Sequence, residues 1–232
     1  MTILITGASR GIGFSTLKSL VALDAQHKIY VLTRNTQALK DKIEADSQLK
    51  TATIEVIPFD LTHFTKEDLL HLWTEVDVLI NNSGLLINKP FSELTEADWL
   101  AMFQTNVLGA AQLTQSLLPL MGQNGKTSHV VNIGSMGGYQ GSSKFAGLSA
   151  YSASKGALAI LSECLAEELK DKNVKCNCLC LGAVDTDMLQ MAFPNYKAPT
   201  TSDEMGQFIA DFALNGHKYF NGKVLPVSIM TP

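Results

Sequence analysis

The sequence has 232 residues, of which 46% are hydrophobic and 17% charged, so the chain can bury one sizeable core. The formal net charge is −4 and no basic run occurs, which argues against nucleic acid or an anionic membrane surface as a partner. No apolar stretch approaches the ~20 residues of a membrane span. The first apolar run begins so early that we expect no leader peptide, and we predict a cytoplasmic protein.

The predicted elements alternate between strands and helices. Strands are expected at residues 3–5, 28–33, 53–57, 77–80, 129–133, 174–181 and 223–227. Helices are expected from residue 14 onward, at 36–47, around 69–73, at 96–121 and at 151–172. Residues 137–149 form a Gly/Ser-rich loop, and residues 185–213 are expected to be a loop with helical pieces. This alternation predicts a parallel α/β sheet with helices on both faces.

Three glycines follow the first strand directly and precede the first helix. Gly7, Gly11 and Gly13 allow a tight turn and a close backbone approach to a pyrophosphate. The free N–H groups and the dipole of the helix that follows attract negative charge. The spacing Gly-x-x-x-Gly-x-Gly differs from the commoner Gly-x-Gly-x-x-Gly fingerprint, but its place after an apolar strand still predicts a phosphate cradle.

Polar residues and glycines recur where predicted strands end. They are Gly7, Arg34, Asp60, Asn82, Ser135 and Gly182. Ligands of open parallel sheets bind at the carboxyl ends of the strands, so these positions predict one binding edge.

A tyrosine and a lysine stand one helical turn apart in the predicted helix 151–172. Tyr151 and Lys155 share a helix face, and a lysine ammonium is expected to lower the pKa of the phenol from its usual value of about 10. Tyr151 could then exchange a proton with a carbonyl or alcohol oxygen, to which Ser135 could also hydrogen-bond. Taken in isolation, the pair is more simply interpreted as surface residues of an amphipathic helix.

The pair is not isolated. Thr6-Gly7-x-x-x-Gly11-x-Gly13, Asn81-Asn82-Ser83-Gly84, Asn106, Ser135 and Tyr151-x-x-x-Lys155 occur in the order and approximate spacing of one family. Over essentially the whole chain, the sequence resembles the classical short-chain dehydrogenases/reductases. Ser83 replaces a usual alanine, Leu181 replaces a usual proline, and the segment between Ser135 and Tyr151 is longer than in many relatives.

The resemblance implies a role for each matching residue. Tyr151 would be the general acid/base, Lys155 would lower its pKa and hold the nicotinamide ribose, Ser135 would orient the carbonyl, and Asn106 would anchor a proton-relay water. The implied cofactor-binding residues are Gly7, Ser9, Arg10, Gly11, Ile12, Gly13, Arg34, Asp60, Leu61, Asn82, Ser83, Gly84, Tyr151, Lys155, Gly182, Val184 and Thr186.

Charge at the exit of the second strand indicates which cofactor is preferred. Thr33, Arg34 and Asn35 follow that strand with no acid until Asp41, and Arg10 lies in the glycine turn. A carboxylate would favour a ribose 2′-hydroxyl, whereas guanidinium groups suit a 2′-phosphate. We therefore predict NADP(H) over NAD(H), the alternative being two solvated surface arginines.

No metal site is predicted. Cys176, Cys178 and Cys180 alternate along a strand, which is more typical of core packing than of metal ligation, and the histidines show no metal-ligand spacing. Met188, Met191 and Phe193 could line an apolar substrate pocket or a lid, or could simply pack a short helix.

Together these observations predict a single-domain, Rossmann-type doubly wound sheet of about seven strands over residues 1–232, with a substrate loop or lid at about 185–213. The predicted function is NADP(H)-dependent reduction of a small-molecule ketone or aldehyde, or the reverse oxidation. A catalytically silent NADP(H) sensor or scaffold is the alternative, and a methyltransferase is disfavoured by the Tyr151 and Lys155 pair. By resemblance, a homodimer or homotetramer would form through the helices 96–121 and 151–172.

Overall fold

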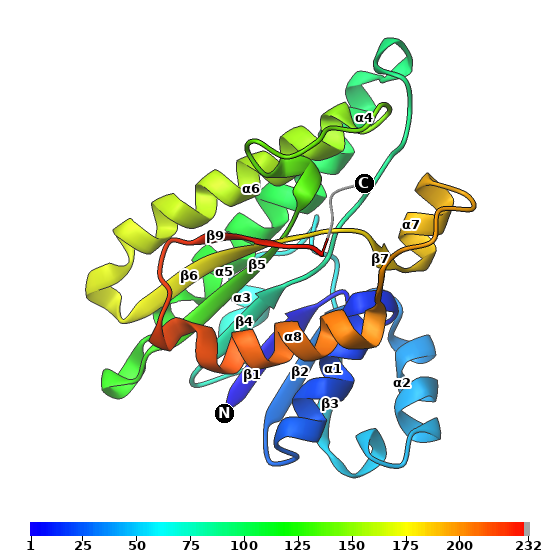
Figure 1. Cartoon of the computed structure of the whole chain (residues 1–232). Coiled ribbons are helices and arrows are strands. Elements are labelled where there is room, and N and C mark those ends of the chain that lie inside the picture. The colour runs from blue at the N-terminus through cyan, green and yellow to red at the C-terminus, as the bar shows by residue number, and fades with distance from the viewer. Residues whose placement is uncertain (230–232) are drawn as a thin grey trace.

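The apolar runs of the sequence form one parallel sheet (Figure 1). The computed structural model describes residues 1–229, and residues 230–232 of the expected single domain lie outside the described residues. Over the described range the sheet has seven strands in the order β3-β2-β1-β4-β5-β6-β9, and every neighbouring pair is parallel. The strands are β1 (Thr2–Thr6), β2 (Lys28–Thr33), β3 (Thr53–Pro58), β4 (Val78–Asn81), β5 (Ser128–Ser135), β6 (Val174–Leu181) and β9 (Val224–Val227).

The strand order reverses between β1 and β4. From β1 the chain builds outward through β2 to β3, then crosses back to place β4 on the other side of β1. In a doubly wound sheet, the connections diverge at this point and leave a crevice at the carboxyl ends of the strands. The residues that follow β1 and β4 therefore face one another across it.

Helices cover both faces of the sheet (Figure 1). On one face lie α1 (Gly11–Leu23), α2 (Thr36–Ala45) and α8 (Ser202–Asn215), and on the other lie α3 (Glu67–Leu70), α4 (Glu96–Phe103), α5 (Gly109–Leu117) and α6 (Ser149–Glu168). Helix α7 (Asp187–Ala192) lies between β7 (Val184–Asp185) and β8 (Thr200–Thr201), which pair in a small second sheet. The remaining short turns are η1 (Leu49–Thr51), η2 (Phe91–Glu93), η3 (Gln104–Leu108), η4 (Leu118–Leu120), η5 (Gln123–Gly125), η6 (Met136–Gly138), η7 (Lys170–Lys172) and η8 (Gly216–Lys218).

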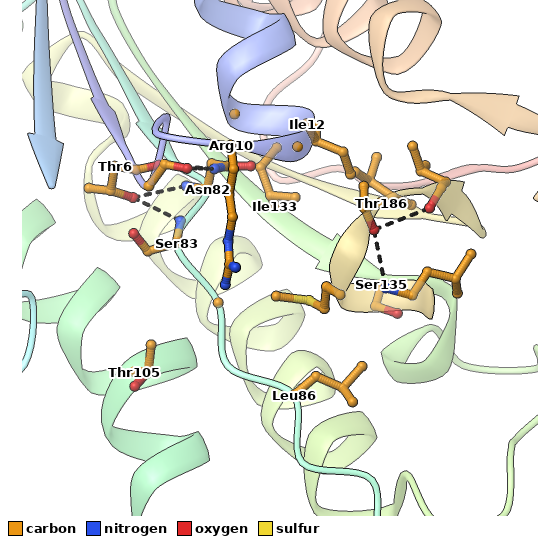
Figure 2. Close-up of a pocket in the computed structure, with 18 of the residues that line it drawn as sticks. Thr6, Arg10, Ile12, Asn82, Ser83, Leu86, Thr105, Ile133, Ser135 and Thr186 are labelled. Carbon is orange, nitrogen blue, oxygen red and sulfur yellow. Dashed lines mark hydrogen bonds between the residues drawn. The ribbon is translucent and has the colours of Figure 1, made fainter. Parts of the chain in front are cut away.

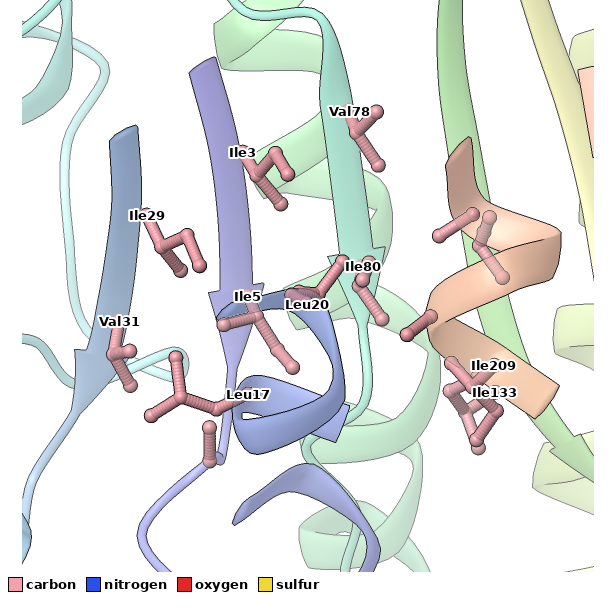
Figure 3. Close-up of a cluster of buried hydrophobic side chains, with 14 of the residues drawn as sticks. Ile3, Ile5, Leu17, Leu20, Ile29, Val31, Val78, Ile80, Ile133 and Ile209 are labelled. Atoms are coloured by element: carbon pink, nitrogen blue, oxygen red, sulfur yellow. The ribbon is translucent and has the colours of Figure 1, made fainter. Parts of the chain in front are cut away.

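The core follows the alternation of side chains along the strands. Ile3 and Ile5 of β1 belong to a buried cluster that includes Leu17 of α1 and Ile209 of α8, and Figure 3 shows Ile5 near Leu17 and Ile209 near Ile133 of β5. Leu4 belongs to the cluster on the opposite face of the sheet. Both clusters are apolar and buried, so the central strands are covered on both sides as the parallel sheet requires.

The single helix expected over 96–121 is interrupted. Helix α4 ends at Phe103, a π-helical turn (η3) follows over Gln104–Leu108, and α5 begins at Gly109. The turn contains the buried Asn106, whose side chain hydrogen-bonds to the chain after β4. A π-turn of this kind is frequent at functional sites and leaves the apolar periodicity of the sequence almost unchanged.

The segment 185–213, expected as a loop with helical pieces, consists of two different parts. Residues from 202 onward form α8, which begins with a capping box between Thr201 and Glu204 and packs tightly on α1. A Cβ on Gly206 would lie 2.5 Å from the backbone carbon of Ser15, and Ser15 Oγ donates to Asp203 at 2.6 Å. Helix α8 therefore belongs to the core, and only the part before it stays a predicted substrate loop.

Candidate functional site

A pocket of about 430 Å³ opens at the carboxyl ends of the strands (Figure 2). Every residue that the sequence predicts to bind the cofactor lines it, together with the predicted catalytic residue Ser135. Asn106 is the one predicted site residue that does not line this pocket. Residues from the first strand and from α6, some 145 positions later, thus meet in one site.

The turn after β1 has the geometry of a phosphate cradle. Gly7 and Gly11 have φ values of +69° and +53°, which favour glycine, and a Cβ on Gly13 would lie 2.4 Å from Asn82 Nδ2. Helix α1 begins after Arg10, whose side chain makes no capping bond, and its first turn carries no acid. The N–H groups of that turn and the helix dipole suit the pyrophosphate of a dinucleotide.

Two strand ends are joined at the crevice by Thr6 and Asn82 (Figure 2). Thr6 Oγ1 accepts hydrogen bonds from the backbone N–H groups of Asn82 and Ser83, each at 3.0 Å. Asn82 Nδ2 donates to the carbonyls of Thr6 at 3.0 Å and Gly7 at 3.1 Å. The side chain of Asn82 therefore holds the glycine turn in place. Thr6 was not predicted as a site residue, although a hydroxyl residue just before the first glycine was a visible signal.

The cationic side chains of the pocket include Arg10 and Arg34, from the glycine turn and the exit of β2. Nearby, Lys42 of α2 donates to the carbonyl of Ser9 at 2.8 Å and so fastens the glycine turn to α2.

Asp60 accepts from the Thr62 hydroxyl at 2.7 Å and the Thr62 N–H at 2.9 Å. These hydrogen bonds hold the pKa of Asp60 below its usual value, so the carboxylate is charged at neutral pH.

The predicted catalytic group lies where β5 and α6 meet. Ser135 ends β5, while Tyr151 and Lys155 follow from α6. Lys155 is 3% exposed, and its Nζ donates to the carbonyl of Ile133 at 2.7 Å and lies 5.9 Å from the centre of the Tyr151 ring. A Cβ on Gly84 would lie 3.5 Å from Lys155 Nζ, so the chain after β4 passes close to the ammonium group.

Burial dominates the titration of both groups. It lowers the pKa of Lys155 to about 8. It raises the pKa of Tyr151, an effect that a hydrogen bond with the Ser135 side chain opposes in part. The direction for Tyr151 is opposite to the sequence-based expectation, because the cost of desolvating a phenolate outweighs the hydrogen bond. The phenol, whose usual pKa is about 10, is therefore protonated at neutral pH.

Asn106 lies beneath the pocket, where it is 1% exposed. Its Oδ1 accepts from the N–H of Leu85 at 2.8 Å, and its Nδ2 donates to the carbonyl of Leu85 and to Ser154 Oγ, both at 2.9 Å. Asn106 thus fastens the chain after β4 to the residue that precedes Lys155. The proton-relay water that the family resemblance implies stays a prediction.

The remainder of the pocket wall is largely apolar. Its apolar and aromatic residues come from four separate segments and are Leu86, Met136, Phe145, Leu148, Met188, Leu189, Phe193 and Tyr196, and Asp187 lines the same part of the pocket. The sequence pointed to Met188, Met191 and Phe193 here, but Met191 does not line the pocket and is 68% exposed. The sequence missed Leu86 and Phe145, because no local pattern links loops so far apart along the chain.

The cysteines of β6 pack in the interior. Cys176, Cys178 and Cys180 are each 0% exposed, as expected of core residues, and burial raises the pKa of Cys176 to about 12. Within residues 1–229, no group of three or more His, Cys, Asp and Glu residues could hold a metal ion. Over the same range, no helix is both long and apolar enough to cross a membrane.

Comparisons with known proteins show the family of the chain. A family model described as short chain dehydrogenase matches residues 1–197. The 3-oxoacyl-[acyl-carrier-protein] reductase FabG of Chlamydia trachomatis is 28% identical over 240 residues, which cover 97% of this chain and 95% of that protein. The NADP-dependent 3-hydroxy acid dehydrogenase of Schizosaccharomyces pombe is 30% identical, covering 83% of this chain and 74% of that protein.

Solved structures show the same architecture. The RhlG/NADP active-site complex of Pseudomonas aeruginosa superposes with a TM-score of 0.84 at 25% identity, over 98% of this chain and 94% of that chain. The protein therefore belongs to the short-chain dehydrogenase family and is an oxidoreductase that interconverts C=O and CH–OH groups with NAD(P)(H).

Proposed function

We propose that the protein is an NADP(H)-dependent reductase that converts a ketone or aldehyde to an alcohol, or runs the reverse oxidation. One observation carries the proposal: the glycine turn with Arg10, the neighbouring Arg34 after β2, and the group Ser135, Tyr151 and Lys155 all line the same pocket. Residues suited to binding phosphate and residues suited to proton transfer therefore line one pocket.

The residues of the chain divide the chemistry between them. When bound, the nicotinamide supplies the hydride for the carbonyl carbon or accepts it from the alcohol. Ser135 donates a hydrogen bond to the carbonyl oxygen and holds it beside Tyr151. Tyr151, which is protonated at neutral pH, gives its proton to that oxygen as negative charge develops.

Lys155 stabilises the phenolate that proton transfer leaves behind. Its ammonium group is held by the Ile133 carbonyl, so it stays beside Tyr151 in a site with little water. Asn106 acts indirectly, as a positioning residue, because its hydrogen bonds to Leu85 and Ser154 set the spacing between α6 and the chain after β4. In the oxidation direction the same proton returns from the alcohol to Tyr151.

Turnover by a Tyr151→Phe variant tests the catalytic assignment. Removing the hydroxyl leaves the aromatic packing in place but takes away the proton donor. The rate of NADPH oxidation with a ketone or aldehyde substrate is expected to fall by about a hundred- to ten-thousandfold. Fluorescence titration should show NADPH binding nearly unchanged, which serves as the folding control. Wild-type activity in this variant would refute the role of Tyr151.

The preference for NADP(H) is proposed from Arg10 and Arg34, which line the pocket near the glycine turn. A guanidinium bonds well to a 2′-phosphate, and losing one such charged hydrogen bond costs roughly ten- to a hundredfold in affinity. Arg34→Ala should therefore weaken NADPH by that factor and NADH by much less. Lys40→Ala, an exposed change on α2, is the matched control. Equal losses for the two cofactors would contradict the proposal.

A homo-oligomer built on α4 and α6 is also proposed. Both helices expose large apolar side chains, with Leu100 62% exposed on α4 and Ile160 60% exposed on α6. Light scattering after size exclusion measures the assembly directly. Leu100→Glu combined with Ile160→Glu should release monomers, and an unchanged mass would place the interface elsewhere.

A further inference from the structure

The apolar part of the pocket defines which carbonyl compounds the site accepts. We infer that it takes an uncharged, hydrophobic ketone or aldehyde, held beside Phe145 and Phe193, and that it discriminates against carboxylate-bearing substrates. This inference rests on the proposed function, because it assumes that the reacting carbonyl lies at Ser135 and Tyr151. Phe145 and Phe193 together are called the aromatic clasp.

The two rings of the clasp come from opposite sides of the pocket mouth. Phe145 belongs to the loop between β5 and α6, and Phe193 follows α7. Their centroids are 6.0 Å apart and their planes are inclined at 67°, which is a favourable edge-to-face contact. Both side chains are partly exposed to the pocket, so their rings offer apolar surface to a ligand.

One side-chain and one backbone hydrogen bond hold the segments around the clasp together. Asn88 Nδ2 donates to the carbonyl of Ala192 at 2.6 Å, and the N–H of Lys89 donates to the carbonyl of Gly147 at 3.1 Å. Gly147 has φ of +84°, and a Cβ there would lie 2.0 Å from Asn88 Oδ1. The chain after β4 therefore ties both rings of the clasp to one support. The part of the pocket that the clasp lines is therefore held in a defined shape.

Two lysines near the clasp already have hydrogen-bond partners, and the carboxylate-bearing Asp187 also lines the pocket. Lys89 Nζ bonds to both carboxylate oxygens of Asp98, at 2.8 and 2.9 Å. Lys144 Nζ bonds to the carbonyl of Tyr139 at 2.6 Å and to Ser142 Oγ at 2.7 Å. Among described residues, the cations lining the pocket are Arg10, Arg34 and Lys155, which the proposed function gives to the cofactor and to Tyr151.

A carboxylate substrate would thus lose its hydration beside the clasp without gaining a counter-ion there. Burying an ionised group without a partner is strongly unfavourable, whereas an alkyl or aryl group gains from leaving water. The preference for a neutral substrate follows from this difference. Leu86, Met136 and Leu148 extend the same apolar surface toward Ser135 (Figure 2 labels Leu86 and Ser135).

A matched pair of ligands tests the inference without relying on turnover. Ethyl benzoylformate and benzoylformate carry the same aryl ketone and differ in having an ester or a carboxylate. Their dissociation constants would be measured by calorimetry with the protein saturated with NADP⁺, which cannot reduce them, and again without nucleotide. The ester is expected to bind at least about tenfold more tightly than the carboxylate.

Variants of the clasp complete the design. Phe145→Ala and Phe193→Ala should each weaken the ester about tenfold and change carboxylate binding much less. Phe193→Leu keeps an apolar side chain in case the alanine variant unfolds. Phe208→Ala is the matched control, because Phe208 pairs with Phe212 at 6.2 Å on α8 and does not line the pocket.

The outcomes separate this inference from the proposed function. Equal binding of the two ligands, tighter binding of the carboxylate, or unchanged ester binding in both the Phe145 and Phe193 variants would overturn the inference. The proposed function fails by a different observation, namely full activity of Tyr151→Phe. Ligand binding to the NADP⁺ complex does not depend on that result.

Discussion

Acid should weaken the fold through His129, a fully buried side chain of β5. Its Nδ1 lies 2.9 Å from the carbonyl of Ala213, so it donates there, and its Nε2 accepts from Asn177 Nδ2 at 3.0 Å. Asn177 cannot turn its amide around without loss, because its Oδ1 accepts from the N–H of Lys223 at 3.0 Å. A second proton on the ring would therefore face an N–H donor.

The size and sign of the effect follow from the pKa of His129. Burial lowers the pKa of this group from 6.5 to about 4. The unfolded chain takes up the proton near pH 6.5 and the folded chain only near pH 4. The stabilisation is thus complete above pH 6.5 and is lost as the pH falls toward 4. At about 1.4 kcal/mol for each pKa unit, the total loss is about 3 kcal/mol.

Urea unfolding of the wild type and a His129→Asn variant, at several pH values between about 5 and 7, measures this effect. Near the middle of the window, the wild type should lose about 1 kcal/mol more per pH unit than the variant. His27, whose pKa burial also lowers, is present in both proteins and cancels in the difference. His217, whose pKa burial lowers as well, has its ring centre 5.6 Å from that of His129, so the slope difference reports the two histidines together. His63→Gln is the control, because its side chain is 85% exposed. If the His129→Asn variant keeps the full wild-type slope, the reasoning is wrong.

Two further predictions concern the support of the site. Gly13→Ala places a Cβ 2.4 Å from Asn82 Nδ2 and 2.5 Å from the Gly7 carbonyl oxygen. Because the glycine turn must shift to make room, NADPH affinity should fall by at least about tenfold in a fluorescence titration. Unchanged binding would contradict the close packing of the turn. Asn106→Ala removes the hydrogen-bond partner of the Leu85 backbone groups and of Ser154. The free energy of unfolding, measured with urea, should therefore fall by about 2 kcal/mol. A value within error of wild type would show that the π-turn does not need this side chain.

The sheet and most of the pocket were predictable because their signals are local. Short apolar runs mark the strands, and the residues just beyond them had to gather at one edge of a parallel sheet. The two arginines and the pair Tyr151 and Lys155 were visible for the same reason. Every predicted cofactor residue lines the pocket, although their individual roles remain proposals.

The rest depends on contacts between distant segments. The π-turn at Asn106 is held by Leu85 and Ser154, neither of which lies in the same helix. Spacing showed that Lys155 stands beside Tyr151, but it could not show that the lysine is almost fully buried while the tyrosine lines the pocket. Desolvation therefore reversed the expected direction of the tyrosine pKa. The aromatic clasp likewise joins two loops that share no pattern.

The contact between α1 and α8 has a consequence for biosynthesis. Helix α1 is made long before α8, whose Met205, Ile209 and Ala210 belong to the cluster that covers it. During translation the apolar side of α1 and the central strands beneath it stay uncovered until α8 has been made. The nascent protein is thus exposed to aggregation for that interval, and a chain truncated before α8 would have an open core.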